Sequence, residues 1–164
     1  MKMNKSVNAT ELGEKLLTIT ESSYRKLKDI SEVESGKKPQ YGGWSHKEII
    51  GHLIDSASNN HQRFVRAQLK NDLIFIGYQQ DEWINVQQYQ TSPWLSLINL
   101  WYEINMHLSR VIAAIPDETL LFNRIEHNLD EIAWKPVAKS EPVTLAYCIN
   151  DYIGHMQHHL KKLI

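Results

Sequence analysis

Two histidines near the end of the chain, His155 and His159, have the spacing of metal ligands. Residues four positions apart lie one above the other on one face of an α-helix, so this pair can offer two imidazoles to one ion. The helical phase places both beside an apolar stripe centred near Met156, where they can face a cleft. The alternative is a chance His-x-x-x-His pair on an amphipathic helix.

A third ligand would strengthen this candidate, because catalytic zinc sites take three ligands from protein and leave a position to water or substrate. His52 is the best candidate, and it shares one helical stripe with four polar residues: Glu48, Asp55, Asn59 and Arg63. That stripe has two interpretations. It is either a solvated surface or the wall of a metal cleft that supplies hydrogen-bond acceptors to the imidazoles.

The other histidines and the single cysteine fit different roles. His158 projects farther round its helix, as a surface residue, and His61 falls in an apolar stripe, as expected of a hydrogen-bonded core histidine. Three histidines have no partner at ligand spacing: His46, His107 and His127. Cys148 can reach the side of His155, but a buried, inert thiol is the favoured interpretation over a ligand or nucleophile. One cysteine excludes an internal disulfide and a Cys-x-x-Cys site.

Four segments with helical periodicity must position these residues. They span about residues 8–30, 45–69, 93–115 and 145–164. Ser45 and Glu48 form a capping box at the start of the second, and Pro93 occupies the first turn of the third. Strand signals are almost absent. The pattern predicts an all-α protein, a four-helix bundle in one domain that spans residues 1–164.

The connections between these segments are long enough to cross the end of a bundle. Residues 70–90 contain a short helix from about residue 80, with Trp83 and Val86, which we interpret as a lid or spacer between the second and third helices. Residues 121–141 carry no clear pattern and are left unassigned.

Composition limits the partners. The chain has 18 Lys plus Arg against 19 Asp plus Glu, so no excess of positive charge favours nucleic acid or an anionic membrane. Residues 1–17 lack an apolar leader core, and no later run approaches the roughly 18 apolar residues of a spanning helix. A cytoplasmic protein is expected. We expect exposed tryptophans on the third helix and on the segment of residues 70–90 that precedes it. Such exposed aromatic side chains suggest a homodimer.

Two motifs, Trp44-Ser45-x-x-Glu48-x-x-x-His52-Leu53 and Asp151-Tyr152-Ile153-Gly154-His155-x-x-x-His159-Leu160, resemble the DinB/YfiT-like superfamily. The Gln80-Asp81-Glu82-Trp83 segment and the Pro93-Trp94 helix start also resemble sequences of members of this group, so the resemblance covers nearly the whole chain. It implies a four-helix bundle with one divalent metal, such as zinc, nickel or manganese, bound by three histidines that map onto His52, His155 and His159.

Members of this superfamily include thiol transferases and isomerases that use low-molecular-weight thiols, and proteins assigned as metal-dependent hydrolases. The leading hypothesis is therefore a metal-dependent enzyme that transfers such a thiol to a small electrophile, with Asn59 and Arg63 as candidate anchors for an anionic cosubstrate. A hydrolase would need Glu48 or Asp55 as general base. A non-catalytic metal-binding stress protein is the third hypothesis.

Overall fold

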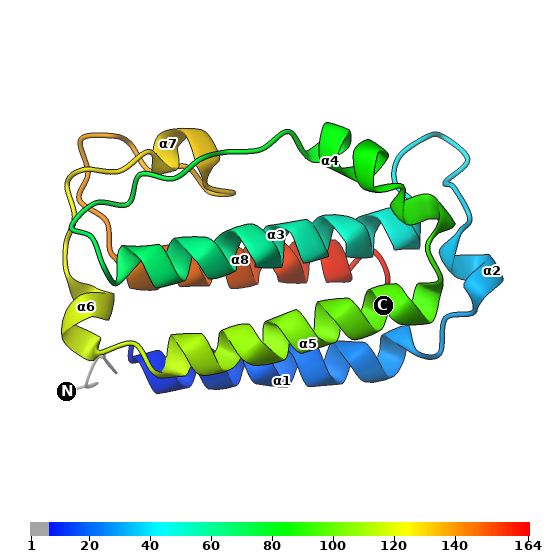
Figure 1. Ribbon diagram of the computed structural model, residues 1–164, viewed down its shortest axis with the longest axis horizontal. Coiled ribbons are helices and arrows are strands. Elements are labelled where there is room, and N and C mark those ends of the chain that lie inside the picture. Colours follow the sequence, from blue (N-terminus) through cyan, green and yellow to red (C-terminus); the bar gives the residue numbers. More distant parts are fainter. Residues whose placement is uncertain (1–6) are drawn as a thin grey trace, which may run out of the picture.

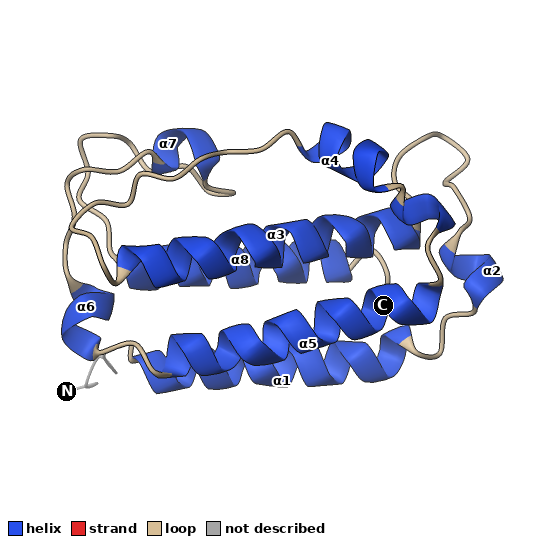
Figure 2. Ribbon diagram, in the orientation of Figure 1, coloured by secondary structure: helices blue, strands red, loops and turns tan. Residues whose placement is uncertain are grey.

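Four long helices form the bundle: α1 (Ala9–Leu27), α3 (His46–Ala67), α5 (Trp94–Ala113) and α8 (Leu145–Leu160). They are seen in a computed structural model that describes residues 7–164. Figure 2 shows only helices and loops over these residues, so the predicted all-α four-helix bundle is confirmed. Residues 1–17 were expected to lack an apolar leader core, and the first six of them lie outside the described residues.

Side-chain caps explain where three of the long helices begin. The Asn8 side chain accepts a hydrogen bond from the Glu11 amide, and Thr144 accepts one from the Tyr147 amide. The predicted capping box of Ser45 and Glu48 is present at α3. Such caps satisfy backbone donors that lack partners inside the helix. The fourth start is different, because the Trp94 amide of α5 donates to the Glu32 carboxylate of α2 (Glu32–Ser35), 2.8 Å away.

The order of helix directions departs from a simple up-and-down bundle. In Figure 1, α1 and α8 run from left to right, whereas α3 and α5 both run from right to left. The consecutive helices α3 and α5 are therefore parallel, since the connection between them travels back along the length of α3. The second long connection leaves α5 and enters α8 at the same end of the bundle. Of the two connections, only the first runs the length of the bundle.

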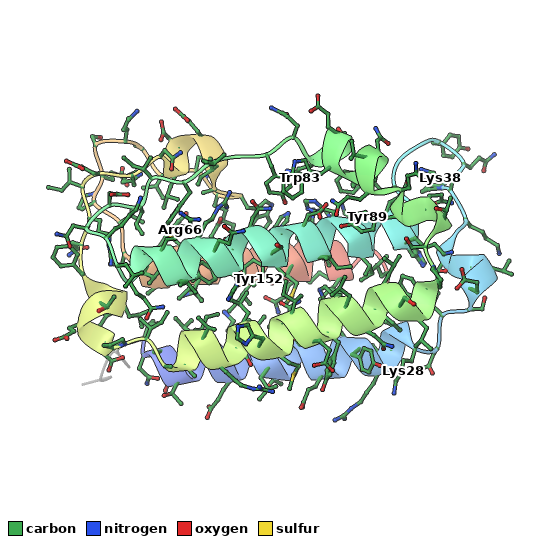
Figure 3. All side chains as sticks on the ribbon, in the orientation of Figure 1. Lys28, Lys38, Arg66, Trp83, Tyr89 and Tyr152 are labelled. Atoms are coloured by element: carbon green, nitrogen blue, oxygen red, sulfur yellow. The ribbon has the colours of Figure 1, made fainter. Side chains whose placement is uncertain are left out.

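The bundle has two layers, α1 with α5 and α3 with α8 (Figure 1). Tyr152 of α8 points between them (Figure 3) and donates a 2.5 Å hydrogen bond to Asn105 of α5. The core holds both tryptophans of α5, Trp94 and Trp101, which are 3% and 0% exposed. The predicted exposure of tryptophans on this helix is therefore wrong, because Trp94 and Trp101 lie on the apolar stripe of the helix, which faces the core. Within the described residues, no helix has the length and apolarity required to traverse a bilayer.

The excursion between α3 and α5 contains α4 (Gln80–Gln87) and a 3-10 turn, η1 (Tyr89–Thr91). Gln88 between them takes a left-handed conformation, with φ 52°. The turn places Tyr89 against α3 (Figure 3), where its hydroxyl donates a 2.6 Å hydrogen bond to Asp55. The Tyr89 ring lies directly on Gly51, because a Cβ added there would be 2.1 Å from the nearest ring carbon. The short helix predicted in this region is confirmed, and it packs on the stripe that carries Asp55.

Gly51→Ala is expected to lower the free energy of unfolding by about 2–4 kcal/mol, because the methyl group displaces Tyr89 and leaves the buried Asp55 carboxyl short of a donor. The intrinsic helix preference of alanine over glycine, about 1 kcal/mol, offsets only part of this loss. Urea unfolding measures the change. In a double-mutant cycle with Tyr89→Ala, the glycine substitution should cost far less once the ring is gone. Equal costs in both backgrounds would show that Tyr89 is not the obstacle.

The connection between α5 and α8 contains two short helices, α6 (Asp117–Leu121) and α7 (Leu129–Ile132), and two isolated bridges, and of the helices α7 lies within the unassigned residues 121–141. Arg124 pairs with Val143, and His127 pairs with Leu73 of the preceding excursion. The Asn128 side chain bonds both the amide and the carbonyl of Phe75, at 3.0 and 2.8 Å. These contacts tie the two long connections together over α3 and α8. They depend on residues distant in sequence, which is why no local pattern marks them.

Candidate metal centre

Three histidines from two helices converge inside the bundle. His52 comes from α3, and His155 and His159 come from successive turns of α8. The Nε2 atoms of His52 and His155 lie 3.1 Å apart, and one nitrogen from each of the three rings lies within 4.8 Å of the others. Ring centroids are 4.6–5.0 Å apart. The convergence predicted from spacing and resemblance is therefore present in the fold.

The environment holds these imidazoles in the neutral form that metals bind. Burial, with smaller contributions from the neighbouring His155, His159 and Lys162, lowers the pKa of His52 to about 3. Burial likewise lowers the pKa of His155 to about 4 and that of His159 to about 3. Burial disfavours the charged form of a base, and adjacent positive charges add to that effect. All three rings are consequently free to donate a lone pair at neutral pH.

The residues fit a divalent metal. Two nitrogens bound to one tetrahedral zinc at about 2.0–2.1 Å are roughly 3.3–3.4 Å apart, close to the observed His52–His155 separation. Nδ1 of His159 is buried without a hydrogen-bond partner among the described residues. Buried polar atoms are normally paired, so this unpartnered atom favours a site built for a ligand. Within residues 7–164, no fourth His, Cys, Asp or Glu joins the set.

Two tryptophans enclose the histidines. Trp44 lies beside His52 and His159, with ring centroids 5.0 and 6.1 Å away, and Trp134 lies 6.2 Å from His155. The Asp151 carboxylate holds the Trp134 segment by accepting the amides of Trp134 and Lys135, both at 2.9 Å. Apolar walls around a metal control solvent access and the local dielectric.

Gly154 explains how Trp134 approaches α8. A Cβ at this position would be 3.0 Å from the Trp134 ring, so the absence of a side chain admits the indole. Two residues of the Asp151-Tyr152-Ile153-Gly154-His155 motif therefore position Trp134. Asp151 holds the backbone of Trp134 and Lys135, and Gly154 leaves room for the Trp134 ring. Sequence reasoning did not assign these roles. The signal was a glycine immediately before a ligand candidate in the interior of a helix, where glycine is otherwise unfavourable.

The candidate carboxylates are occupied by other partners. Glu48 accepts hydrogen bonds from Lys38 and from the Ser45 amide, which hold its pKa below the usual value against the opposing effect of burial. Asp55 accepts from Tyr89 and from Gln87, while burial raises its pKa. Neither carboxylate accepts a hydrogen bond from a histidine of the cluster. Glu48, His52 and Asp55 are all buried, so the solvated-surface interpretation of this part of the stripe is wrong. This part of α3 is covered by α8 and by the connection that contains α4 and η1.

The remaining histidines lie apart from the cluster. His158 is exposed, as predicted, and its ring lies 5.6 Å from Trp134. His61 is not in the core: it is half-buried, and its Nε2 lies 3.3 Å from that of the exposed His107, because this end of its helix stripe faces α5 near solvent. His127 is buried and bonds the Glu141 carbonyl and the Leu129 amide. Its role is to connect loop segments.

A cavity of about 250 Å³ adjoins His155. It lies between α3 and α8 on one side and residues 75–80 and 129–134 on the other. Arg63 and Cys148 line it, whereas Asn59 is absent from its walls and donates to the Asp55 carbonyl at 2.9 Å. Burial raises the pKa of the Cys148 thiol to about 12, so this cysteine stays protonated, in keeping with the inert thiol expected from the sequence.

Comparison with known proteins agrees with the four-helix bundle. The family model of the DinB superfamily matches residues 16–163. The chain belongs to the DinB superfamily. The resemblance inferred from the two motifs is thereby confirmed. The match includes both helices that carry the three histidines.

Relatives of this DinB-superfamily chain carry a common description. The Bacillus subtilis protein named "Putative metal-dependent hydrolase YfiT" is 23% identical over 154 residues, which cover 92% of this chain and 81% of the relative. A Bacillus mycoides protein named in the same way is 24% identical over 135 residues, 82% of this chain and 71% of its own length.

The solved structure of Bacillus subtilis YfiT has the same fold. It is described as a probable metal-dependent hydrolase with an unusual four-helix bundle topology. It superposes with a TM-score of 0.73 at 16% sequence identity, over 98% of this chain and 87% of YfiT. At this identity the likeness establishes the fold alone.

Proposed function

We propose that this protein is a metal-dependent enzyme in which His52, His155 and His159 bind one divalent ion. The observation that carries the proposal is the convergence of three neutral imidazoles, one buried and two half-buried, beside a cavity that His155 lines. Three protein ligands without a fourth leave coordination positions for a substrate, as catalytic rather than structural zinc sites do. The cavity beside His155 gives a small molecule access to these positions. This combination is unexpected in a protein that merely stores or senses a metal.

The reaction we propose is transfer of a low-molecular-weight thiol to a small electrophile. A bound divalent metal acts as a Lewis acid that lowers the pKa of a coordinated thiol or water. The protein contributes the three imidazoles that hold the ion and the rings of Trp44 and Trp134 that limit water. Thiol transfer needs no general base beyond this, which agrees with the engagement of Glu48 and Asp55 by other residues.

Hydrolysis is the second candidate, favoured by the names of the relatives from Bacillus subtilis and Bacillus mycoides. For this reaction we propose Asp55 as the general base. It lies three residues from His52 on α3, its Oδ2 is buried without a partner among the described residues, and burial raises its pKa towards neutrality. Glu48 is the weaker choice because Lys38 neutralises it.

Thiol and ester substrates separate the two reactions. With metal-loaded protein and either cysteine or glutathione, we expect conjugation of chlorodinitrobenzene well above the rate with the same concentration of free metal. The absorbance of the dinitrophenyl thioether measures it. Turnover of p-nitrophenyl acetate without thiol, abolished in Asp55→Asn, would instead support the hydrolase. The control is His155→Ala, which should lack both activities. A metal-binding protein that accelerates neither reaction would contradict the proposal that it is an enzyme.

A further inference from the structure

The cavity beside His155 is elongated along the two helices that form its floor. On α8 it extends from His155 to Tyr147, eight residues away, and on α3 it extends from Ser56 to Phe64. At a rise of 1.5 Å per residue, eight residues of α-helix span about 12 Å. The three-histidine cluster lies at one end of this length and the Arg63 guanidinium belongs to the other. A molecule that reaches both must be long rather than compact.

Arg63 brings an uncompensated positive charge to that far end. Its Nη2 donates to the Ile76 carbonyl at 3.2 Å, and its guanidinium carbon lies 5.9 Å from the Phe75 ring centroid. Among the described residues, no carboxylate lies within ion-pair distance of it. A guanidinium stays charged in proteins and presents five hydrogen-bond donors, and most of those of Arg63 have no acceptor among the described residues. Arg63 is half-buried, and an anion that pairs with it offsets the cost of partly removing its charge from water.

The other charged groups of the cavity do not neutralise Arg63. Asp151 uses both carboxylate oxygens to accept the amides of Trp134 and Lys135. Glu131 is exposed at the surface. Among residues 7–164, no lysine and no second arginine line the cavity. One guanidinium matches one negative charge, so a carboxylate fits better than a doubly charged phosphate, which would leave excess negative charge near Asp151.

Apolar and polar side chains share the walls between the two ends. The apolar side chains are Phe64, Phe75, Leu129, Ile132 and Trp134, and polar ones such as Ser56, Asn60 and Tyr78 lie among them. Small-molecule sites commonly combine apolar walls with a few convergent polar groups. The apolar side chains favour a hydrocarbon or aromatic body between the anionic group and the group that reaches the histidines.

We propose that this cavity binds an elongated monocarboxylate whose carboxylate pairs with Arg63 and whose opposite end reaches the three-histidine cluster. This inference names the substrate class of the proposed enzyme. The part that concerns the three-histidine cluster rests on the proposed function, whereas the pairing of the carboxylate with Arg63 does not. An arginine and a carboxylate form a bidentate, charge-assisted pair, which selects for this anion over a neutral isostere. The anchor fixes the distance between the carboxylate and the reacting end of the substrate.

Calorimetric titration of the zinc-loaded protein tests the whole assignment with ω-mercaptohexanoate and its neutral analogue ω-mercaptohexanol. We expect the carboxylate to bind about 10- to 100-fold tighter, the range for hydrogen bonds to a charged group. Arg63→Gln should bring the two affinities within about 2-fold of each other. Arg63→Lys, which keeps the charge without the fork, should retain an intermediate preference. Arg66→Gln, on the exposed side of the same helix, should behave as wild type.

A second titration omits the metal, so that failure of this inference is distinguished from failure of the proposed function. Metal-free protein should bind phenylbutanoate more tightly than phenylbutanamide, and Arg63→Gln should lose that preference. If the thiol compounds fail while phenylbutanoate keeps its dependence on Arg63, the metal function is wrong and the carboxylate site stands. Equal affinity for acid and amide in wild type, or a preference that survives in Arg63→Gln, would overturn the site. Circular dichroism of each variant verifies that it is folded.

Discussion

His155→Ala abolishes stoichiometric binding of a divalent metal while the protein remains helical. This is the largest effect we expect, because the site has three protein ligands and the loss of one leaves two imidazoles in a cleft that contains no replacement among the described residues. His159→Ala should behave in the same way. Elemental analysis after dialysis measures the metal content, and circular dichroism measures the helix content.

Thermal unfolding gives an independent measurement of the same site. A ligand present at 100 times its Kd stabilises a native protein by about 2.7 kcal/mol. Added zinc should therefore raise the Tm of the wild-type protein and leave that of His155→Ala unchanged. The matched control is His158→Ala, since this exposed histidine lies between the two ligand candidates in sequence and outside the cluster. Full metal content in either His155→Ala or His159→Ala would refute the assignment.

Trp101→Ala is expected to lower the free energy of unfolding by about 3–5 kcal/mol, the range for removal of a large aromatic side chain from a core. Trp101 is completely buried in α5. Its Nε1 has no hydrogen-bond partner among the described residues, so the loss is one of packing and not of a hydrogen bond. Urea unfolding measures the change through the transition midpoint at constant m-value.

The adjacent residue provides the control for this prediction. Leu100 is 52% exposed, and Leu100→Ala should change the free energy of unfolding by only about 0.5 kcal/mol. The comparison also tests the surface role that the sequence suggested for tryptophans on this helix. If Trp101→Ala had little effect on unfolding of the monomer but weakened self-association, the indole would lie in an interface and not in the core.

Much of the candidate site could be predicted from sequence because it depends on local geometry. The spacing of His155 and His159 places both on one helical face whatever surrounds the helix. The same periodicity located the four long helices, and the capping box marked the start of α3 within a residue. Membership in the DinB superfamily, implied by two motifs, was what raised His52 above other polar residues of its stripe.

Other features depend on contacts between segments that are distant along the chain. The exposure of the stripe that holds Glu48 and Asp55 could not be decided locally, because its burial requires Tyr89 and the excursion to fold back over α3. The same periodicity did not establish that Trp101 is buried in the core instead of exposed to solvent. Amphipathic periodicity predicts which residues share a helix face, whereas the packing of the helices decides what that face contacts.

The sequence by itself determined the four helices and the placement of His155 and His159 on successive turns of one helix face, since these follow from periodicity and from the 1.5 Å rise of a helix. Only the tertiary structure decided that His52 reaches His155, that Trp134 closes over Gly154, and that Arg63 ends a cavity that begins at the histidines. The physical reason is that these are meetings between elements whose relative positions are set by packing of the whole core. A candidate metal site assembled from two helices therefore forms only together with the bundle.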